Sequence, residues 1–538
     1  MENIFFHKAT PRRHEEKHKQ PGLWFLTALL FLHAATFLAQ LPTIYEFANF
    51  VFFDPGVTLR TDKLLEQGYV PTVDFGYPYS LLPLILGRAF FALTSRTPAA
   101  YILFMFLAEA AVLIGLWRLA KNFGWLIAVF VLAAIPHAII PVYVHLTHPL
   151  EAALIVHTIA DLAVGRRARA LAIATVCLFV KPAMAYVLGF LILALAILQL
   201  LRQHENLKSF FYFLRPAIIT GAACLTISSA YFGLIPTISA LIPTNGAQSY
   251  KALGFGFFAN GKTFWLPKLG SATQFAQYYA TTPAGFWIIC TLLIAAFGLL
   301  SLWNSIQPLC APSAFFAPLR LKKLCGVLFS SHSFVSSSCD FVEEKSETLI
   351  VIAVCHFTFL FTFFGWPGSW TYYSSLLVAG TALGLATFRV RPALILAMIL
   401  IALAGNFERY QITANAWKWM KRSPESAGLW AFQNQRDEWN HARALAGDRR
   451  IFYFNNGCAE LLYPNIDSPV SFFLSPDQQA PIEFDRIRQQ LDQATIVVTF
   501  NQATVLDPWN WPEFAAQREK FEETWQGVYV TVHERKRQ

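Results

Sequence analysis

Long apolar runs alternate with short polar connections over the first three quarters of the chain. Runs of about 17–22 apolar residues predict transmembrane helices, because this length crosses the hydrocarbon core of a bilayer. One further apolar run, 79–94, is interrupted by Pro83 and Arg88, and we interpret it as a helix lying in the membrane interface. The eleven expected spanning helices lie near residues 23–41, 99–118, 124–142, 150–164, 169–179, 183–200, 214–235, 284–303, 347–365, 370–388 and 391–407.

Composition agrees with this pattern and sets the C-terminal end apart. The chain is 55% hydrophobic and 14% charged, whereas a soluble domain is about 25% charged. Residues 408–538 carry 32 of the 75 Lys, Arg, Asp and Glu residues and contain no apolar run long enough to span. The predicted fold class is therefore a polytopic α-helical membrane protein with about eleven transmembrane helices and a C-terminal soluble α/β domain.

Basic residues predict the orientation. With the polar, basic N-terminus in the cytoplasm, the inner segments carry nineteen Lys and Arg residues and the outer loops eight, as the positive-inside rule requires. This places the C-terminal domain on the outer face, which is the periplasm for a bacterial inner-membrane protein. The expected parts are the N-terminus 1–22, the transmembrane domain 23–407 with outer loops 42–98 and 236–283 and inner loop 304–346, and the outer domain 408–538.

Helix and strand patterns alternate in the outer domain. Strands are expected at 450–454, 495–500 and 528–532, and amphipathic helices at 481–493 and about 511–525. Such alternation predicts a small α/β sandwich. We interpret it as a lid or docking platform, with acceptor recognition as the alternative.

Two carboxylates stand out in the first outer loop. Asp54 precedes Pro55-Gly56, and Asp74 begins the segment Asp74-Phe75-Gly76-Tyr77-Pro78. Carboxylates at a bilayer boundary are costly unless solvated or paired, which makes both functional candidates. Asp54 either takes a proton from an incoming hydroxyl or amine, or caps a helix that begins near Val57. We expect Asp74 to shape a turn beside an acceptor or sugar pocket that includes Tyr77.

Several cations and aromatic residues lie at other outer junctions. Lys181, before Pro182, either neutralises a lipid-linked phosphate or snorkels from a helix end. Lys251 and Lys262 lie in an aromatic outer loop suited to phosphate contacts or to interface anchoring. Further candidates for a sugar pocket are Trp370 and Tyr372, which are alternatively part of an interfacial aromatic belt.

The remaining ionisable residues in or near the spans have mostly structural interpretations. His145, His148 and Glu151 are three residues apart, but Pro149 argues against a metal site, and a divalent metal is compatible with the chain without being predicted. His148 and Glu151 alternatively contact an acceptor. Glu109 and Asp161 are expected to pair with Arg or His. No cofactor is assigned, and the cysteines, which lack metal-ligand spacing, are expected to pack.

These features together resemble a known family. The segment from Gly68 to Leu84 reads G-x-x-P-x-x-D-F-x-Y-P-Y-x-x-x-P-L, with an acid before it, a short acidic second outer loop after it, and Lys181-Pro182 at a helix junction. This pattern resembles integral-membrane glycosyltransferases of the C superfamily, of the protein O-mannosyltransferase and aminoarabinose-transferase type.

The resemblance implies a function. It implies transfer of a sugar from a polyprenyl phosphate to a lipid, glycan or protein acceptor on the outer face, with inversion at the anomeric carbon. By resemblance, Asp54 is the catalytic acid of the first loop, Glu151 the acid of the second, and Lys181 a residue beside the carrier phosphate. Pro55 departs from the pattern, because many relatives have Glu there. Membrane lipids are expected partners and nucleic acids are not.

Two other functions stay open. A polymerase or ligase of surface glycans would use the same compartment but typically relies on outer-loop arginines, where this chain favours lysine. A transporter would be expected to have inverted repeats and paired broken helices. No convincing repeat is found in the sequence.

Overall fold

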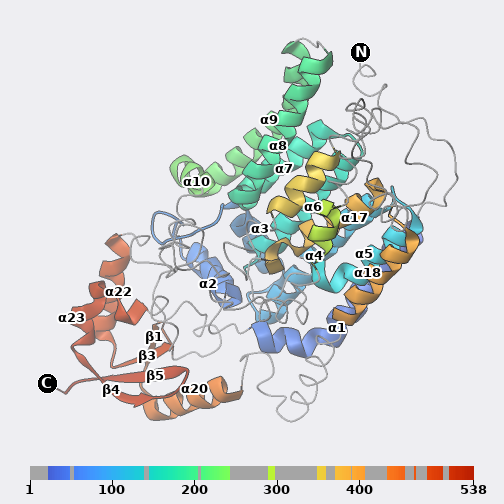
Figure 1. Cartoon of the computed structure of the whole chain (residues 1–538). Helices are drawn as coiled ribbons and strands as arrows, with labels where there is room; N and C mark the ends of the chain where they lie inside the picture. Colours follow the sequence, from blue (N-terminus) through green and yellow to red (C-terminus); the bar gives the residue numbers. More distant parts are fainter. Residues whose placement is uncertain are drawn as a thin grey trace, which may run out of the picture.

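The computed structural model describes most of the helical part and about half of the C-terminal domain (Figure 1). The described residues are 22–48, 54–138, 145–203, 207–242, 287, 289–296, 348–358, 370–388, 390–405, 433–454, 466–467, 481–500 and 508–537. At some segment ends, including Asp54 and residues 370–372, only the backbone is described.

Helices dominate the first three quarters of the chain (Figure 1). The described parts of the eleven apolar runs are mostly helical, although Gly233 divides the run 214–235, and the membrane crossing itself stays a prediction. The interrupted run 79–94 is also a helix, α3, of 13 residues. The helices are α1 (Leu23–Ala48), α2 (Asp54–Glu66), α3 (Leu82–Thr94), α4 (Pro98–Ala120), α5 (Trp125–Ala138), α6 (Thr147–Ala163), α7 (Arg167–Val180), α8 (Pro182–Gln203), α9 (Leu207–Phe232), α10 (Leu234–Leu241), α17 (Trp370–Thr387) and α18 (Pro392–Gly405).

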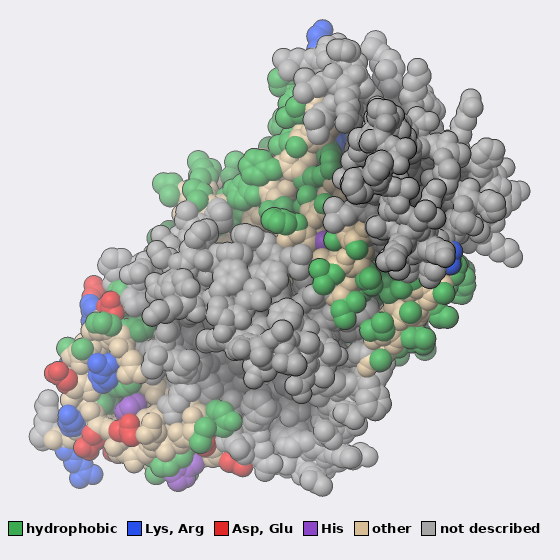
Figure 2. Space-filling model, viewed as in Figure 1, with side chains coloured by type: hydrophobic (Ala, Val, Ile, Leu, Met, Phe, Trp, Pro, Cys, Tyr) green, Lys and Arg blue, Asp and Glu red, His purple; other side chains and the backbone are tan. Residues whose placement is uncertain are grey.

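Two described helices are long and apolar enough to cross a membrane. They are Pro98–Ala120 and Lys208–Phe232, and seven described apolar helices are shorter. Figure 2 shows hydrophobic side chains along the exposed surfaces of α9 and α18, whereas charged side chains gather over the C-terminal domain. On α9 and α18 the exposed large residues include Phe211, Tyr212, Ile218, Leu396 and Leu400.

Helix α6 is central to the helical core. It packs against α4 and α7, and Gly115 of α4 allows the close approach, because a Cβ atom there would come within 2.9 Å of Val156 Cγ1. Near its C-terminal end, buried Asp161 pairs with Arg118 at 2.5 Å and Arg169 at 2.6 Å. The expected pairing of Asp161 is thereby confirmed.

Glu109 lies close to a histidine, the kind of neighbour expected for it. Its Oε2 lies 3.8 Å from His33 Nε2 of α1, and both side chains are buried. Four cysteines of the described residues, Cys177, Cys224, Cys290 and Cys355, are free thiols and buried in the helical core, which agrees with the packing role predicted for them.

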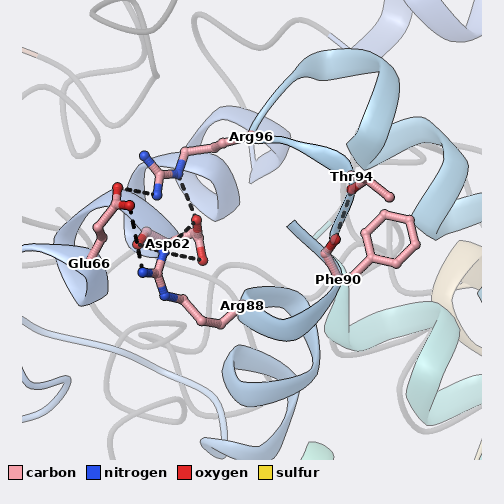
Figure 3. Close-up of polar contacts among 6 residues, drawn as sticks. All are labelled: Asp62, Glu66, Arg88, Phe90, Thr94 and Arg96. Carbon is pink, nitrogen blue, oxygen red and sulfur yellow. Dashed lines mark hydrogen bonds and ion pairs between the residues drawn. The ribbon is translucent and has the colours of Figure 1, made fainter. Parts of the chain in front are cut away.

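A four-residue ion network ties α2 to α3 and to the loop that follows (Figure 3). Arg96 donates to Asp62 at 2.6 Å and to Glu66 at 2.5 Å. Arg88 lies 3.3 Å from Asp62 and 3.7 Å from Glu66. Thr97 then caps α4 by accepting a hydrogen bond from the Ala100 amide, with Pro98 in the first turn. The network therefore fixes the direction of α2 relative to the core.

The C-terminal domain contains a five-stranded sheet with the order β2-β1-β3-β5-β4. β1 pairs in parallel with β2 and β3, while β5 is antiparallel to β3 and β4. The elements are α20 (Gln433–Ala446), β1 (Ile451–Phe454), β2 (Ile466–Asp467), α22 (Pro481–Gln493), β3 (Ile496–Phe500), α23 (Ala515–Arg518), β4 (Phe521–Gln526) and β5 (Val530–Arg535).

Alternation along β1 builds two cores, one on each face of the sheet. Tyr453 packs on one side with Trp439 of α20, and Phe454 on the other with Ile487 of α22. A strand exposes successive side chains to opposite faces, so one short apolar strand supplies both cores. The expected strands near 450–454 and 495–500 and the helix 481–493 are confirmed.

The helix expected at about 511–525 is wrong. Two short 3-10 turns, Pro508–Asn510 and Pro512–Phe514, lead into the four-residue α23, and β4 begins at Phe521. Good helix formers fill this segment, but pairing of β4 with β5 at the sheet edge overrides their propensity. The closing strand accordingly starts at Val530, two residues later than expected.

Candidate functional site

A buried polar cluster lies where the N-terminal end of α6 meets the C-terminal end of α7. Lys181 Nζ donates to Glu151 Oε2 at 3.0 Å, and the two side chains are 12% and 1% exposed. Lys181 follows the last residue of α7 and has extended backbone, as is typical of a residue before proline. The Lys-Pro pair thus ends one helix, starts the next, and leaves the lysine between them.

Two further side chains contact the same ammonium group. Lys181 Nζ lies 3.3 Å from His148 Nδ1 and 3.5 Å from the hydroxyl of Tyr373 on α17. His148 stands one turn before Glu151 on α6. Glu151 balances the lysine charge, yet its second oxygen, Oε1, is buried without a hydrogen-bond partner among the described residues. That oxygen is available to accept from a hydroxyl group.

Aromatic side chains from the first-loop segment border this cluster. Tyr79 lies with its ring centroid 4.7 Å from that of His145 and 5.8 Å from that of His148. The Tyr77 hydroxyl is 3.4 Å from His145 Nε2. Ring contacts between two tyrosines of the first-loop segment and two histidines therefore join this segment to the start of α6.

The protonation state of His145 follows from its surroundings. Burial, together with the nearby charge of Lys181, lowers the pKa of His145 to about 3, so the ring is neutral. The Thr147 amide donates to Nδ1 at 3.3 Å, which leaves the proton on Nε2. His145 can therefore donate to the Tyr77 oxygen.

Asp74 occupies a turn that precedes Tyr77 and Tyr79 in the chain. Its Oδ2 accepts from the Val70 amide at 2.8 Å, which confirms the turn role expected for it. Its Oδ1 lies 3.3 Å from Arg486 Nη2 of α22. The contacts found for Asp74 thus run to Val70 and to the C-terminal domain, and its assignment to the sugar pocket stays a prediction.

Other candidates are placed only in part. Asp54 is the first residue of α2, so the helix starts there and not near Val57, and its side chain lies outside the described residues. Trp370 and Tyr372 belong to the first turn of α17, and their side chains are likewise not described. Lys251 and Lys262 lie entirely outside the described residues.

The aromatic stretch that ends at Tyr373 was considered for a sugar pocket, but Trp370 and Tyr372 were selected from it, and Tyr79 was given no role in the site. Tyr373 directly follows the chosen Tyr372, and a helical turn separates neighbouring residues by about 100°, so one of the two faces the core. His145 was weighed only as a metal ligand. Within the described part of the chain no three His, Cys, Asp or Glu side chains are placed to hold a metal ion.

Comparison with known proteins gives a remote structural match and no sequence match. No protein-family model and no curated protein matches the chain. Two crystal structures of ArnT from Cupriavidus metallidurans, one bound to undecaprenyl phosphate and one in the apo state, align over 94% of this chain and 98% of theirs. Their identity is 11%, with TM-scores of 0.40 and 0.38. A likeness this remote assigns the chain to no family.

Proposed function

We propose that this chain is an integral-membrane glycosyltransferase that moves a sugar from a polyprenyl phosphate to a lipid, glycan or protein acceptor on the outer face. The observation that carries the proposal is the largely buried Lys181, which contacts Glu151, His148 and Tyr373 at a helix junction beside the first-loop segment. A desolvated cation with several hydrogen-bonding neighbours suits an anionic leaving group.

Lys181 would bind the phosphate of the donor. Because the phosphate is ionised when it leaves, it needs charge stabilisation and no general acid. The ammonium group has three N–H donors, and a phosphate oxygen can replace the weaker contacts to His148 and Tyr373 while Glu151 stays at 3.0 Å. Glu151 is then a residue that positions Lys181, and its Oε1 can accept from a sugar or acceptor hydroxyl.

Asp54 would act as the general base. It removes the proton from the acceptor hydroxyl or amine as the acceptor oxygen or nitrogen bonds to the anomeric carbon. The bond between that carbon and the phosphate oxygen breaks on the opposite side, and the phosphate departs with the electron pair. One displacement of this kind inverts the anomeric configuration. The ion network that fixes α2 supports the assignment, because Asp54 begins that helix.

The test is transfer by the purified full-length protein in lipid nanodiscs. A panel of labelled polyprenyl-phosphate sugars is offered with lipid, glycan and peptide acceptors, and NMR of the product reports its anomeric configuration. We expect transfer by the wild type and at least a hundredfold loss in Asp54→Asn and Lys181→Gln, the order of effect of removing a catalytic acid–base or an electrostatic stabiliser.

Lys121→Gln is the matched control. Lys121 directly follows the C-terminal end of α4 and lies against the Trp117 ring, and none of the contacts found for it is to the Lys181 cluster. Equal transfer by wild type and Lys181→Gln would refute the role of Lys181. Retention of configuration would refute the single displacement. Movement of sugar–lipid across liposomes without transfer would favour the transporter alternative.

A further inference from the structure

One contact joins the C-terminal domain to the first-loop segment. Arg486, on α22, reaches Asp74 at 3.3 Å across 412 residues of sequence, and its guanidinium carbon lies 4.9 Å from the centre of the Tyr69 ring. Both charged side chains are partly buried, at 29% and 23% exposure. In Figure 1, α22 lies at the part of the domain that is nearest to α2.

Asp74 uses its two oxygens for two different parts of the molecule. Oδ1 faces Arg486, while Oδ2 holds the turn by accepting from the Val70 amide. The turn is tight: the Asp74 amide donates to Val70 O and the Thr72 amide to Phe75 O, each at 2.8 Å. Thr72 has φ +65°, an unfavourable conformation for a β-branched residue, so the turn depends on its surroundings.

The chain beyond this turn leads directly to the candidate site. Phe75 and Tyr77 are 1% and 4% exposed in a cluster with residues of α2, α3 and α10. Tyr77 then contacts His145, and Tyr79 contacts both His145 and His148. His148 contacts Lys181. An unbroken series of contacts therefore runs from α22 to the lysine assigned to the phosphate.

We propose that Arg486 is a positioning residue, through which the C-terminal domain holds the turn at residues 70–75 so that Tyr77 and Tyr79 stand against the two histidines. The domain is then a working part of the site, beyond the lid or platform expected from sequence. The catalytic side of this inference rests on the function proposed above, whereas the contact itself can be tested without activity.

The experiment compares four full-length proteins with the wild type: Arg486→Gln, Asp74→Asn, the double variant, and Arg488→Gln. Asn at position 74 can still accept from the Val70 amide. Arg488 is the matched control, because it lies on the same helix and contacts Asp485, Phe484 and Glu513 within its own domain. Hydrogen exchange of peptides covering 69–80 and steady-state transfer are measured for each.

We expect faster exchange over 69–80 in Arg486→Gln and Asp74→Asn but not in Arg488→Gln. The kcat for transfer should fall about fivefold with the KM for the donor unchanged, because a partly exposed ion pair and a cation–π contact are each modest. The double variant should be no worse than the poorer single variant, since both substitutions remove the same contact.

Unchanged exchange over 69–80 in Arg486→Gln would overturn the proposal, whatever the enzyme does. If Arg486→Gln also loses protection in β3 and β5, the substitution has disturbed the domain itself. Asp74→Asn then decides, because it leaves α22 intact. Unchanged exchange over 69–80 in Asp74→Asn would overturn the proposal as well. Absence of transfer by the wild type would count against the proposed function alone. Equal kcat in Arg486→Gln and wild type, with altered exchange, would refute the positioning role.

Discussion

At the scale of single residues, the pairing of Lys181 with Glu151 matters most. A buried pair is costly to form, and its net contribution to stability is often small, whereas the loss of one partner leaves an uncompensated charge. Glu151 is more deeply buried than Lys181 and keeps one oxygen without a partner among the described residues. This is an arrangement suited to ligand contact, since a core built for stability alone would satisfy that oxygen.

The pair makes a prediction that separates stability from activity. Glu151→Leu should lower the free energy of unfolding by about 3–5 kcal/mol, because Lys181 keeps its charge in a buried place. Adding Lys181→Met should recover most of that loss while transfer stays absent. Thermal unfolding in detergent, alongside the transfer assay, measures both. A double variant no more stable than Glu151→Leu would show that the charge of Lys181 is not the cause.

At the scale of elements, α2 is held by side chains that come from α3 and the loop after it. Asp62 is 5% exposed and receives both arginines, and Arg96 has the shorter contacts. The hydrogen bond from Arg96 to Glu66, together with the charge of Arg96, lowers the pKa of that carboxyl group. The two arginines therefore stabilise α2 to different extents, although they contact the same two carboxylates (Figure 3).

We predict that Arg96→Gln loosens α2 more than Arg88→Gln does. Loss of the charged hydrogen bond to buried Asp62 should cost about 2 kcal/mol, and the longer Arg88 contacts about half of that. Faster hydrogen exchange over 54–66 and a lower kcat, through displacement of Asp54, are the expected readouts. Identical exchange in the two variants would contradict this ranking.

Sequence periodicity located helices well and edge strands poorly. Apolar runs such as 99–118 and 183–200 coincide with α4 and α8, because a long helix is defined by its own residues. In contrast, β4 is defined by pairing with β5, and its residues Glu522 and Glu523 give no sign of that partner. The Lys181–Glu151 pair could be anticipated from two helix ends, but Arg486 could not, since nothing local to α22 indicates Asp74.

At the scale of the whole molecule, a buried histidine should make the C-terminal domain sensitive to acid. Burial, together with the charge of Arg518, lowers the pKa of His533 to about 4. The ring lies between Thr499 of β3 and Trp509, inside the C-terminal domain. Its pKa in an unfolded chain is about 6.5, so protons bind the unfolded form first as the pH falls.

The C-terminal domain should therefore lose stability between pH 6.5 and about 4, and not above pH 6.5. The slope should reach at most about 1.4 kcal/mol per pH unit from this residue. Opening free energies from hydrogen exchange of β3 and β5 in the full-length protein, corrected for the intrinsic pH dependence of exchange, measure the slope. His533→Gln should flatten it, and an unchanged slope in that variant would exclude His533 as the source.

The two ends of α6 have a mechanical consequence. Glu151 and Asp161 are ten residues apart, about 15 Å along the axis. Glu151 forms an ion pair with Lys181 at the junction of α7 and α8, and Asp161 forms ion pairs with Arg118 of α4 and Arg169 of α7. Sliding α6 by one residue would break both sets of contacts at once. This helix is therefore a fixed reference against which other parts move, and any opening that admits a substrate must come from segments without such a double anchor.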